Sequence, residues 1–188
     1  MFAKIFIKKG NDIVLANQKG NTNFEHVIHH IKPVYDANSR ILILGSIPSP
    51  ASRTFGFYYG HKQNLFWPLL ADLLDKAEPQ PTIEARKAFV LSHHIALWDV
   101  LLEADIKGAA DSSIRSAVVN DFSVILNAAK IKAIFTTGKT AFNYYSRLAE
   151  HQTGIKAIYL PSTSPANRAA QKKPEFLKSW QQILKYIL

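Results

Sequence analysis

Two stretches of the sequence combine polar side chains with tight turns, and each follows an apolar run. Gly45-Ser46-Ile47-Pro48-Ser49 follows the apolar residues 41–44, and a Ser/Pro-rich stretch, Pro161 to Arg168, follows residues 155–160. A buried strand that ends in such a turn presents backbone N–H groups and hydroxyls at its carboxyl end. Ligands of open α/β sheets bind at that edge. We therefore expect the functional site to be built mainly from these two stretches.

Aromatic rings crowd the segment that follows the first stretch. Phe55, Phe57, Tyr58 and Tyr59 lie within five residues, and the sequence HKQNLFW follows at 61–67. These rings either fill the core or form a platform on which a nucleic-acid base stacks. Asn64 stands at the start of an expected helix, where its side chain is either a helix cap or a group of the active site.

Other catalytic patterns are absent or have a simpler interpretation. Residues 133–140 (AIFTTGKT) end like a phosphate-binding loop, but Ala133 replaces the glycine which that motif requires. The spacing of His26, His29 and His30 could suit a metal, yet the sequence offers them no carboxylate partner beyond the adjacent Glu25, so we interpret them as solvated or packed histidines. The chain has no cysteine and neither a GxSxG nor an HExxH motif. We expect no metal and no cofactor.

Composition sets broader limits on the class of protein. The 188 residues fit one domain, and we assign residues 1–188 to it, with 1–22 as an N-terminal extension. Lys and Arg number 23 against 14 Asp and Glu, a formal charge of +9. Such an excess attracts polyanions, although a merely basic soluble protein is the alternative. No secretory signal and no membrane-spanning run is present, so we expect a cytoplasmic protein that does not contact membranes.

Apolar runs and helical patterns alternate along the chain. Strands are expected at 41–45, 94–100, 132–137 and 155–160, and helices at 64–76, 82–92, 122–129, 139–149 and 175–187. This alternation predicts an α/β fold with a parallel sheet covered by helices on both faces. Residues 3–8 and 12–17 predict an N-terminal β-hairpin around Gly10-Asn11. Residues 24–31 are expected to form a helical turn or an approach segment, and 103–121 a polar, loop-rich region.

Motifs in a fixed order cover residues 33 to about 170. They are GSIPS at 45–49, YYGHKQNLFW at 58–67 and LPSTSPAN at 160–167, with PVYD at 33–36, ALWDV at 96–100 and GKTAF at 138–142. Together they resemble the uracil-DNA glycosylase superfamily, and within it most closely the hypoxanthine-DNA (deoxyinosine) glycosylases. The N-terminal hairpin lies outside this resemblance.

The resemblance implies both a fold and an activity. The fold would be a three-layer sandwich around a central four-stranded parallel sheet, with the site at the carboxyl ends of the strands. The activity would be that of a monofunctional DNA glycosylase of base-excision repair. Such an enzyme flips a deaminated base out of DNA, here hypoxanthine before uracil or xanthine, and hydrolyses its N-glycosidic bond.

The chain departs from the superfamily at one catalytic position. Relatives carry a water-activating Asn or Asp two residues after the first motif's glycine, where this chain has Ile47. The resemblance leaves Asn64 as the replacement. A neutral amide is a poor base, so Asn64 would orient a water through its carbonyl oxygen. Helix capping by Asn64 is the alternative, and the two roles can coexist.

The resemblance also assigns residues to the base and to the DNA. Tyr59 matches the aromatic on which the flipped base stacks, backbone N–H groups around Gly45, Ser46 and Ile47 would bind the base or its leaving anion, and Ser162 stands where relatives bind the leaving base. Asp99 is a candidate for reading a base edge, with packing or capping as the alternative. The remaining residues are expected to contact DNA: Asn167 or Arg168 in the gap left by the flipped nucleotide, and Ser49, Ser52 and Ser164 on phosphates.

Two other classes of function stay open at this point. Without a polar side chain at Ile47, the chain could be a non-catalytic module that binds damaged DNA. A small-molecule nucleoside hydrolase is a weaker alternative, because a charge of +9 favours a polymeric partner. We expect a monomer that acts on DNA containing deaminated bases.

Overall fold

The computed structural model describes residues 7–9, 12–14, 24–108 and 113–187. Its centre is a four-stranded parallel sheet in the order β5-β4-β8-β9. The strands are β4 (Ile41–Gly45), β5 (Ile95–Asp99), β8 (Ala133–Thr137) and β9 (Ala157–Leu160). All four were predicted from their apolar runs, and the expected three-layer α/β fold is confirmed.

β4 is the strand around which the sheet is built. Its neighbours are β5 on one side and β8 on the other, and all five of its residues are buried. A strand covered on both faces needs continuous apolar side chains rather than alternating ones, which explains the run Ile41-Leu42-Ile43-Leu44. The register pairs Gly45 with Asp99, so the polar turn after β4 lies beside the last residue of β5.

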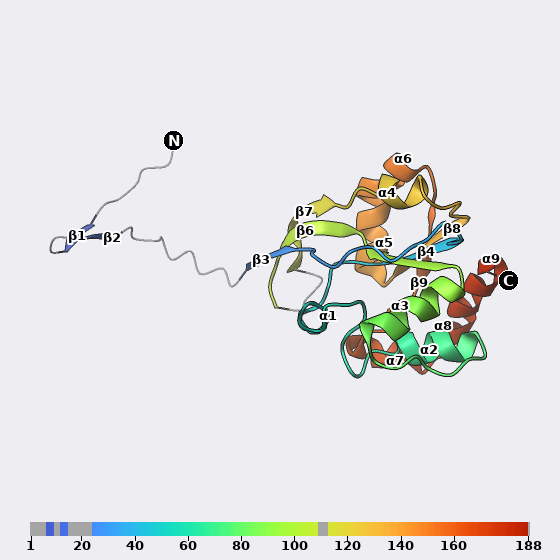
Figure 1. The fold of residues 1–188 in the computed structure, drawn as a ribbon. Helices are drawn as coiled ribbons and strands as arrows, with labels where there is room; N and C mark the ends of the chain where they lie inside the picture. Colours follow the sequence, from blue (N-terminus) through green and yellow to red (C-terminus); the bar gives the residue numbers. More distant parts are fainter. Residues whose placement is uncertain (1–6, 10–11, 15–23, 109–112, 188) are drawn as a thin grey trace.

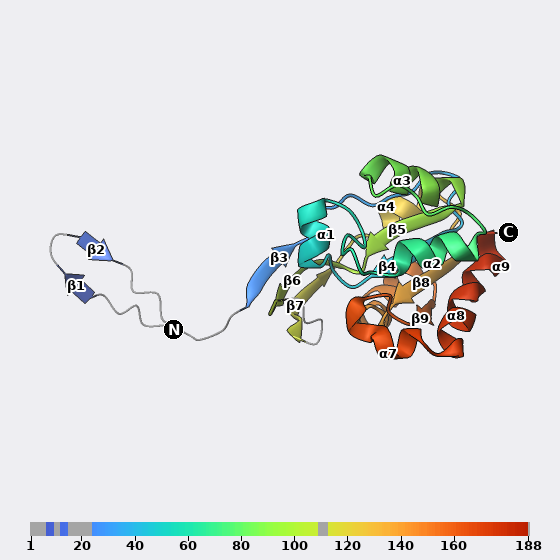
Figure 2. The same cartoon turned by 90° about the horizontal axis from the view of Figure 1, so that it is seen from below.

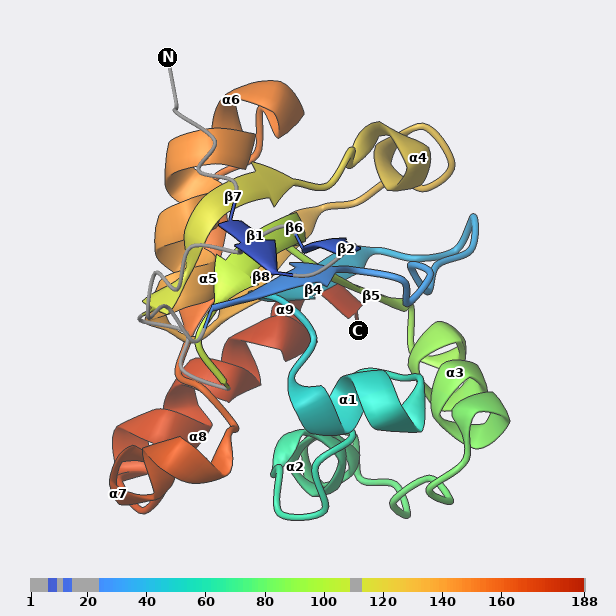
Figure 3. The same cartoon turned by 90° about the vertical axis from the view of Figure 1, so that its left-hand side faces the viewer.

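Helices cover both faces of this sheet. In Figures 1 and 3, α1, α2, α3, α7 and α8 lie on one side and α4, α5 and α6 on the other. Their bounds are α1 (Pro50–Phe55), α2 (Phe66–Leu73), α3 (Ile83–Ser92), α4 (Ser123–Leu126), α5 (Lys139–Tyr144), α6 (Glu150–Thr153), α7 (Arg168–Gln171) and α8 (Pro174–Trp180). A π-helical turn at Tyr145–Ala149 joins α5 to α6, and the chain continues through Gln181–Ile183 into α9 (Leu184–Ile187).

The prediction of helices was less complete than that of the core strands. α1 lies in a stretch expected to be an aromatic-rich loop. It is one short helix that begins after Ser49, whose side chain accepts the N–H of Ser52, and ends at Gly56 with φ of 78°. Six residues are too few for a helical period to be recognised in the sequence. No helix within the described residues is long and apolar enough to cross a membrane.

A second, antiparallel sheet corrects two of the sequence predictions. It has the order β3-β6-β7 and consists of β3 (Glu25–Ile28), β6 (Leu101–Ile106) and β7 (Arg115–Val119). β3 replaces the expected helical turn or approach segment, and β6 and β7 replace the expected loop-rich region. The pairing of β6 with β7 shifts register between Leu101 and Asp105. Such a bulge interrupts the alternation by which a half-buried strand is recognised.

The antiparallel sheet extends the parallel sheet at its carboxyl edge. Only Val100 separates β5 from β6, and the backbone N–H of Leu101 donates to the carbonyl of Ser46. Figure 2 shows β3, β6 and β7 beside the parallel sheet, next to α1. This second sheet therefore borders one side of the edge at which a ligand site is expected.

The N-terminal hairpin is present as a short antiparallel pair. β1 (Ile7–Lys9) pairs with β2 (Asp12–Val14) and aligns Lys8 with Ile13. The rest of the predicted hairpin, residues 3–6, 10–11 and 15–17, lies outside the described residues.

A histidine on β3 gives the second sheet a pH-dependent contact. His26 is paired in register with Asp105, and its Nδ1 lies 2.9 Å from that carboxylate. This hydrogen bond raises the pKa of His26 above its ordinary 6.5 and lowers the pKa of Asp105 below 3.8. The pair therefore stabilises the fold between these two folded-state pKa values. The contribution of the pair to stability is lost as pH rises through the folded-state pKa of His26, or falls through the folded-state pKa of Asp105.

We predict that replacing His26 by Gln costs stability mainly in mildly acidic solution. Urea unfolding of wild type and His26→Gln should differ more at about pH 5.5 than at about pH 8.5, because the charged imidazole is present only at the lower pH. His30→Gln, a change at a neighbouring exposed histidine, serves as the control and should show no such trend. An equal difference at both pH values would contradict the assignment.

Candidate active site at the carboxyl edge of the sheet

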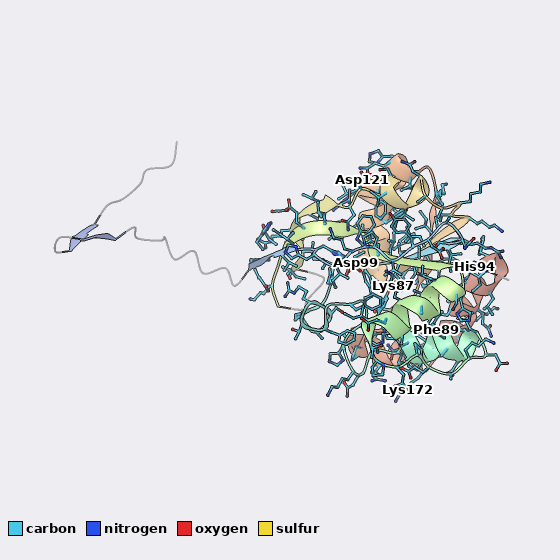
Figure 4. All side chains as sticks on the ribbon, viewed as in Figure 1. Lys87, Phe89, His94, Asp99, Asp121 and Lys172 are labelled. Carbon is cyan, nitrogen blue, oxygen red and sulfur yellow. The ribbon has the colours of Figure 1, made fainter. Side chains whose placement is uncertain are left out.

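The site centres on a close approach between β4 and β5. A Cβ atom added to Gly45 would overlap Asp99 Oδ1, so the Asp99 carboxylate lies directly over the bare Cα of Gly45. The carbonyls of Gly45 and Ser46 accept the N–H groups of Val100 and Leu101 and hold the two strand ends together. Only glycine lets a side chain from the neighbouring strand come this near the backbone. Figure 4 labels Asp99 near the middle of the domain rather than at its outline.

Asp99 is buried and held from two directions. Its carboxylate Oδ2 lies 2.9 Å from Nε2 of His29, a residue just beyond β3, and its backbone carbonyl accepts the side-chain N–H of Asn120. Only 6% of Asp99 and 7% of His29 is exposed. A buried carboxylate with a fixed orientation is typical of a group that recognises a ligand.

Tyr59 brings an aromatic ring to the same edge. Its hydroxyl pairs with that of Thr137, at the end of β8, at 3.2 Å, and the Thr137 hydroxyl donates to the Leu44 carbonyl. One face of the ring stacks on Phe66, with centroids 3.7 Å apart and planes 8° from parallel. A base could stack only on the opposite face. Burial raises the pKa of Tyr59, so its phenol is neutral at physiological pH.

Asn64 contacts the start of α2 from the position before the helix N-cap, which is Leu65. Its Oδ1 accepts the backbone N–H of Phe66, the first residue of the helix, at 3.0 Å, and so satisfies one of the N–H groups that a helix start leaves free. The side chain is half-buried, and a carbonyl oxygen has a second lone pair with which it can accept a water. Phe66 links Asn64 to the ring of Tyr59. Its backbone N–H donates to Asn64 Oδ1, and its ring stacks on that of Tyr59.

A basic cavity of about 330 Å³ opens beside Asn64. It is lined by residues 61–65, Trp67, Pro68, Glu78, Arg86 and Arg168. The Arg86 guanidinium lies 4.8 Å from the Trp67 ring centroid and 5.2 Å from that of Phe55. Arg168 donates to the backbone carbonyl of Gln63 and so joins the second polar stretch to the Asn64 loop. Cationic groups placed this way suit a phosphate backbone.

The second polar stretch is a loop tied down by its own side chains. The Ser162 hydroxyl accepts the N–H of Ser164, while Asn167 and Gln171 both donate to the Ser162 carbonyl. The Thr163 carbonyl accepts the Leu65 N–H, which fastens this loop to the start of α2. Asn167 is therefore occupied within the loop, and exposed Arg168 is the better candidate for the gap left by a flipped nucleotide.

Gly138 sets the position of Ser162 relative to the sheet. It joins β8 to α5 with φ of 89°, and its N–H donates to the Leu160 carbonyl at the end of β9. A Cβ at Gly138 would lie 3.3 Å from Ser162 Cβ. The GKT sequence therefore forms a strand-to-helix turn. This turn brings the segment after β8 next to the loop after β9, which carries Ser162.

Ile47 of the first stretch and Ser52 of the following helix α1 are mainly structural. Ile47 is 7% exposed and belongs to the hydrophobic core, so only its backbone is left for a ligand. The buried Ser52 hydroxyl accepts the N–H of Gly60 and the hydroxyl of Ser49, which closes the loop after α1. A phosphate contact was expected of Ser52, but its burial leaves exposed Ser49 as the better candidate.

Sequence reasoning missed several contributors to the site. His29 was interpreted as a solvated or packed histidine without a carboxylate partner, yet its partner Asp99 lies 70 positions away. Thr137 and Arg86 were not singled out. No signal marks Arg86 in the sequence, whereas the position of Thr137 at the carboxyl end of an expected strand could have pointed to it. Within the described residues, no group of three or more His, Asp or Glu side chains is placed to hold a metal.

Comparison with known proteins places this architecture in a family. Residues 32–185 match the model of the uracil DNA glycosylase superfamily. Proteins named hypoxanthine DNA glycosylase from Methanosarcina barkeri and Methanosarcina acetivorans are each 32% identical over 154 residues, covering 81% of this chain and 95% of theirs. A solution NMR structure from M. acetivorans, described as a candidate uracil DNA glycosylase, superimposes with a TM-score of 0.69. It is 30% identical and covers 85% of this chain and 97% of its own.

The match covers most of the chain, and the chain belongs to the uracil DNA glycosylase superfamily. It is therefore a DNA glycosylase, and DNA is its substrate. The N-terminal β1-β2 pair precedes the matched residues.

Proposed function

We propose that this glycosylase removes hypoxanthine from DNA by hydrolysis of its N-glycosidic bond. The observation that carries the proposal is the group at the carboxyl edge of the sheet, where the buried Asp99 carboxylate lies over Gly45 and near the Tyr59 hydroxyl. The names of the Methanosarcina relatives agree with this choice of base.

Asp99 supplies a reason for selecting a deaminated base. A carboxylate only accepts hydrogen bonds. Hypoxanthine presents an N1–H donor, whereas adenine, from which it forms, presents a lone pair at N1. Asp99 therefore attracts the damaged base and repels the normal one. Uracil carries an N–H at N3 and could bind in the same way, so this contact separates hypoxanthine and uracil from adenine and cytosine, the bases from which they form, and does not by itself separate purines from pyrimidines.

The chemical step needs a positioned water. In this proposal the second lone pair of Asn64 Oδ1 holds the water, which attacks C1′ as the bond to N9 of hypoxanthine breaks. The bonding electrons leave with the base, and the proton from water goes to solvent or to the base. Backbone N–H groups of residues 45–47 stabilise the negative charge that develops on the base.

The loop around Arg168 supplies DNA contacts. Arg168, Lys62 and Arg86 line the cavity beside Asn64, and Ser49 and Ser164 lie on the two polar stretches. Contacts of this kind fix the position of the duplex without reading its sequence. Flipping costs least for a weakly paired base, which adds to the selection.

We predict that the protein releases hypoxanthine from DNA. Duplexes of one sequence carrying a single deoxyinosine, deoxyuridine, deoxyxanthosine or deoxyadenosine are incubated with the protein and cleaved at abasic sites with alkali. Deoxyinosine should react fastest and deoxyadenosine not at all. Tight binding without release would make the chain a damage-binding module, and release only from free deoxyinosine would make it a nucleoside hydrolase. Either result would overturn the proposal.

The role of Asn64 is testable separately from its helix cap. Asn64→Ala should lower the single-turnover rate by roughly 100-fold or more and cost about 0.5–2 kcal/mol of stability through the lost cap. Asn64→Ser should restore most of the stability, because serine caps well, but not the rate. Asn127→Ala, an exposed asparagine after α4, is the control. Full activity of Asn64→Ser at wild-type stability would reduce Asn64 to a cap.

Tyr59 should contribute through its ring rather than its hydroxyl. Tyr59→Leu should weaken kcat/KM on deoxyinosine DNA by roughly 5- to 150-fold, the equivalent of about 1–3 kcal/mol of stacking. Tyr59→Phe keeps the ring on Phe66 and should retain most of the activity. Tyr159→Leu, which removes an exposed ring on β9, serves as the control. Equal losses for Phe and Leu would assign the effect to the bond with Thr137 instead.

A further inference from the structure

His29 is a buried histidine that the proposed chemistry does not use. It follows β3, and its backbone N–H donates to the Leu102 carbonyl at 2.7 Å, which continues the pairing of β3 with β6. The imidazole points away from the outer face that carries His26 and reaches Asp99 at 2.9 Å. The side chains of His29 and Asp99 are 1% and 8% exposed, so bulk water hardly screens the contact.

The hydrogen bonding of His29 indicates which proton it carries. Nε2 must donate, because an ionised carboxylate only accepts. Nδ1 is buried and has no hydrogen-bond partner among the residues that the structure describes. His29 therefore meets the carboxylate through a proton on Nε2.

Two buried phenols, those of Tyr58 and Tyr59, also face the Asp99 carboxylate. Burial is the main cause that raises the pKa of both phenols, and the charge on Asp99 raises each further. The Tyr58 hydroxyl donates to the carbonyls of Ile31 and Lys32. Both phenols are therefore neutral, and neither supplies a cation that would cancel the charge.

The two carboxylate oxygens of Asp99 have different surroundings. Oδ2 is held by His29, and Oδ1 lies over the Cα of Gly45 at the sheet edge. A carboxylate with one oxygen fixed cannot rotate freely. The direction in which Oδ1 offers its lone pairs is therefore set by a residue on the other sheet.

We infer that His29 is the positioning residue for base selection: by holding Asp99 Oδ2 it fixes the orientation of the carboxylate and aims Oδ1 at the N–H of the flipped base. The inference rests on the proposed function of the site and adds to it a second residue that determines specificity. His29 acts through Asp99 and touches neither the scissile bond nor the DNA.

The test compares two replacements of His29 with a neighbouring control. His29→Gln retains an N–H donor, His29→Leu removes it, and His30→Leu changes the adjacent exposed histidine. Without the donor, Oδ2 of Asp99 is no longer held and the carboxylate can turn away from the base. Single-turnover release of hypoxanthine by His29→Leu should therefore fall by at least about tenfold relative to wild type. His29→Gln should recover most of this loss, and His30→Leu should match wild type.

A selectivity measurement separates positioning from a structural role. Loss of a strand contact would lower every rate by the same factor. If the Asp99 carboxylate is no longer held in one orientation, the ratio of deoxyinosine to deoxyuridine release should instead change by about fivefold or more. The reason is that hypoxanthine N1–H and uracil N3–H occupy different places on their rings. An unchanged ratio of deoxyinosine to deoxyuridine release in His29→Leu would leave His29 as a structural contact and overturn the inference.

A readout without substrate keeps this result distinct from failure of the proposed function. At one pH, the carbon-13 chemical shift of the Asp99 carboxyl should differ between His29→Leu and wild type, and His29→Gln should stay close to wild type, because this shift reports hydrogen bonding to the carboxyl. If wild type released no base while this difference was present, the glycosylase proposal would fail but the coupling of His29 to Asp99 would stand. If base was released and the chemical shifts coincided, only the inference about His29 would fail.

Discussion

The contact between the Asp99 carboxylate and the bare Cα of Gly45 is the constraint on which the rest of the site depends. It requires a glycine at the end of β4, a parallel register that pairs Gly45 with Asp99, and a partner that holds the carboxylate in place. That partner, His29, comes from the antiparallel sheet. The second sheet is thus part of the site and not an addition to a complete domain.

Phe66 connects the proposed base-stacking ring of Tyr59 to the proposed catalytic amide of Asn64. Its ring supports Tyr59 from below, and its backbone N–H is capped by Asn64. The start of α2 therefore fixes both the proposed stacking surface and the proposed water-holding amide. This sharing lets a capping residue acquire a catalytic role at little structural cost, because the helix already holds its carbonyl oxygen in one orientation.

Ile47 lies where the family resemblance led us to expect a polar catalytic side chain. The residue is instead a buried member of the core. In the proposed mechanism, the first motif retains the backbone that receives the leaving base, and the water is held from the opposite side. Recognition and bond cleavage then depend on separate segments, residues 45–47 with Asp99 for the base and Asn64 for the water.

Local patterns in the sequence determined the parallel sheet, most of its helices and the polar turns that follow β4 and β9. Continuous apolar runs mark strands buried on both faces, and tight Gly/Ser/Pro turns mark strand ends, so these features need no knowledge of distant residues. Motif order also identified the family, whereas the Tyr59 base platform and the water-holding role of Asn64 stay predictions. β3, β6 and β7 were not predicted, because a register shift between β6 and β7 interrupts their alternation and β3 has only four residues.

Only the tertiary structure decided the partners of the site residues. The pairing of His29 with Asp99 joins positions 70 residues apart, and neither residue type announces the other in sequence. The same holds for Thr137 with Tyr59 and for Arg168 with the carbonyl of Gln63. Burial, too, was decided there: it turned Ser52 from a phosphate contact into a loop hydrogen bond. Such contacts depend on how strands and loops meet in space, which the spacing of residues along a chain does not encode.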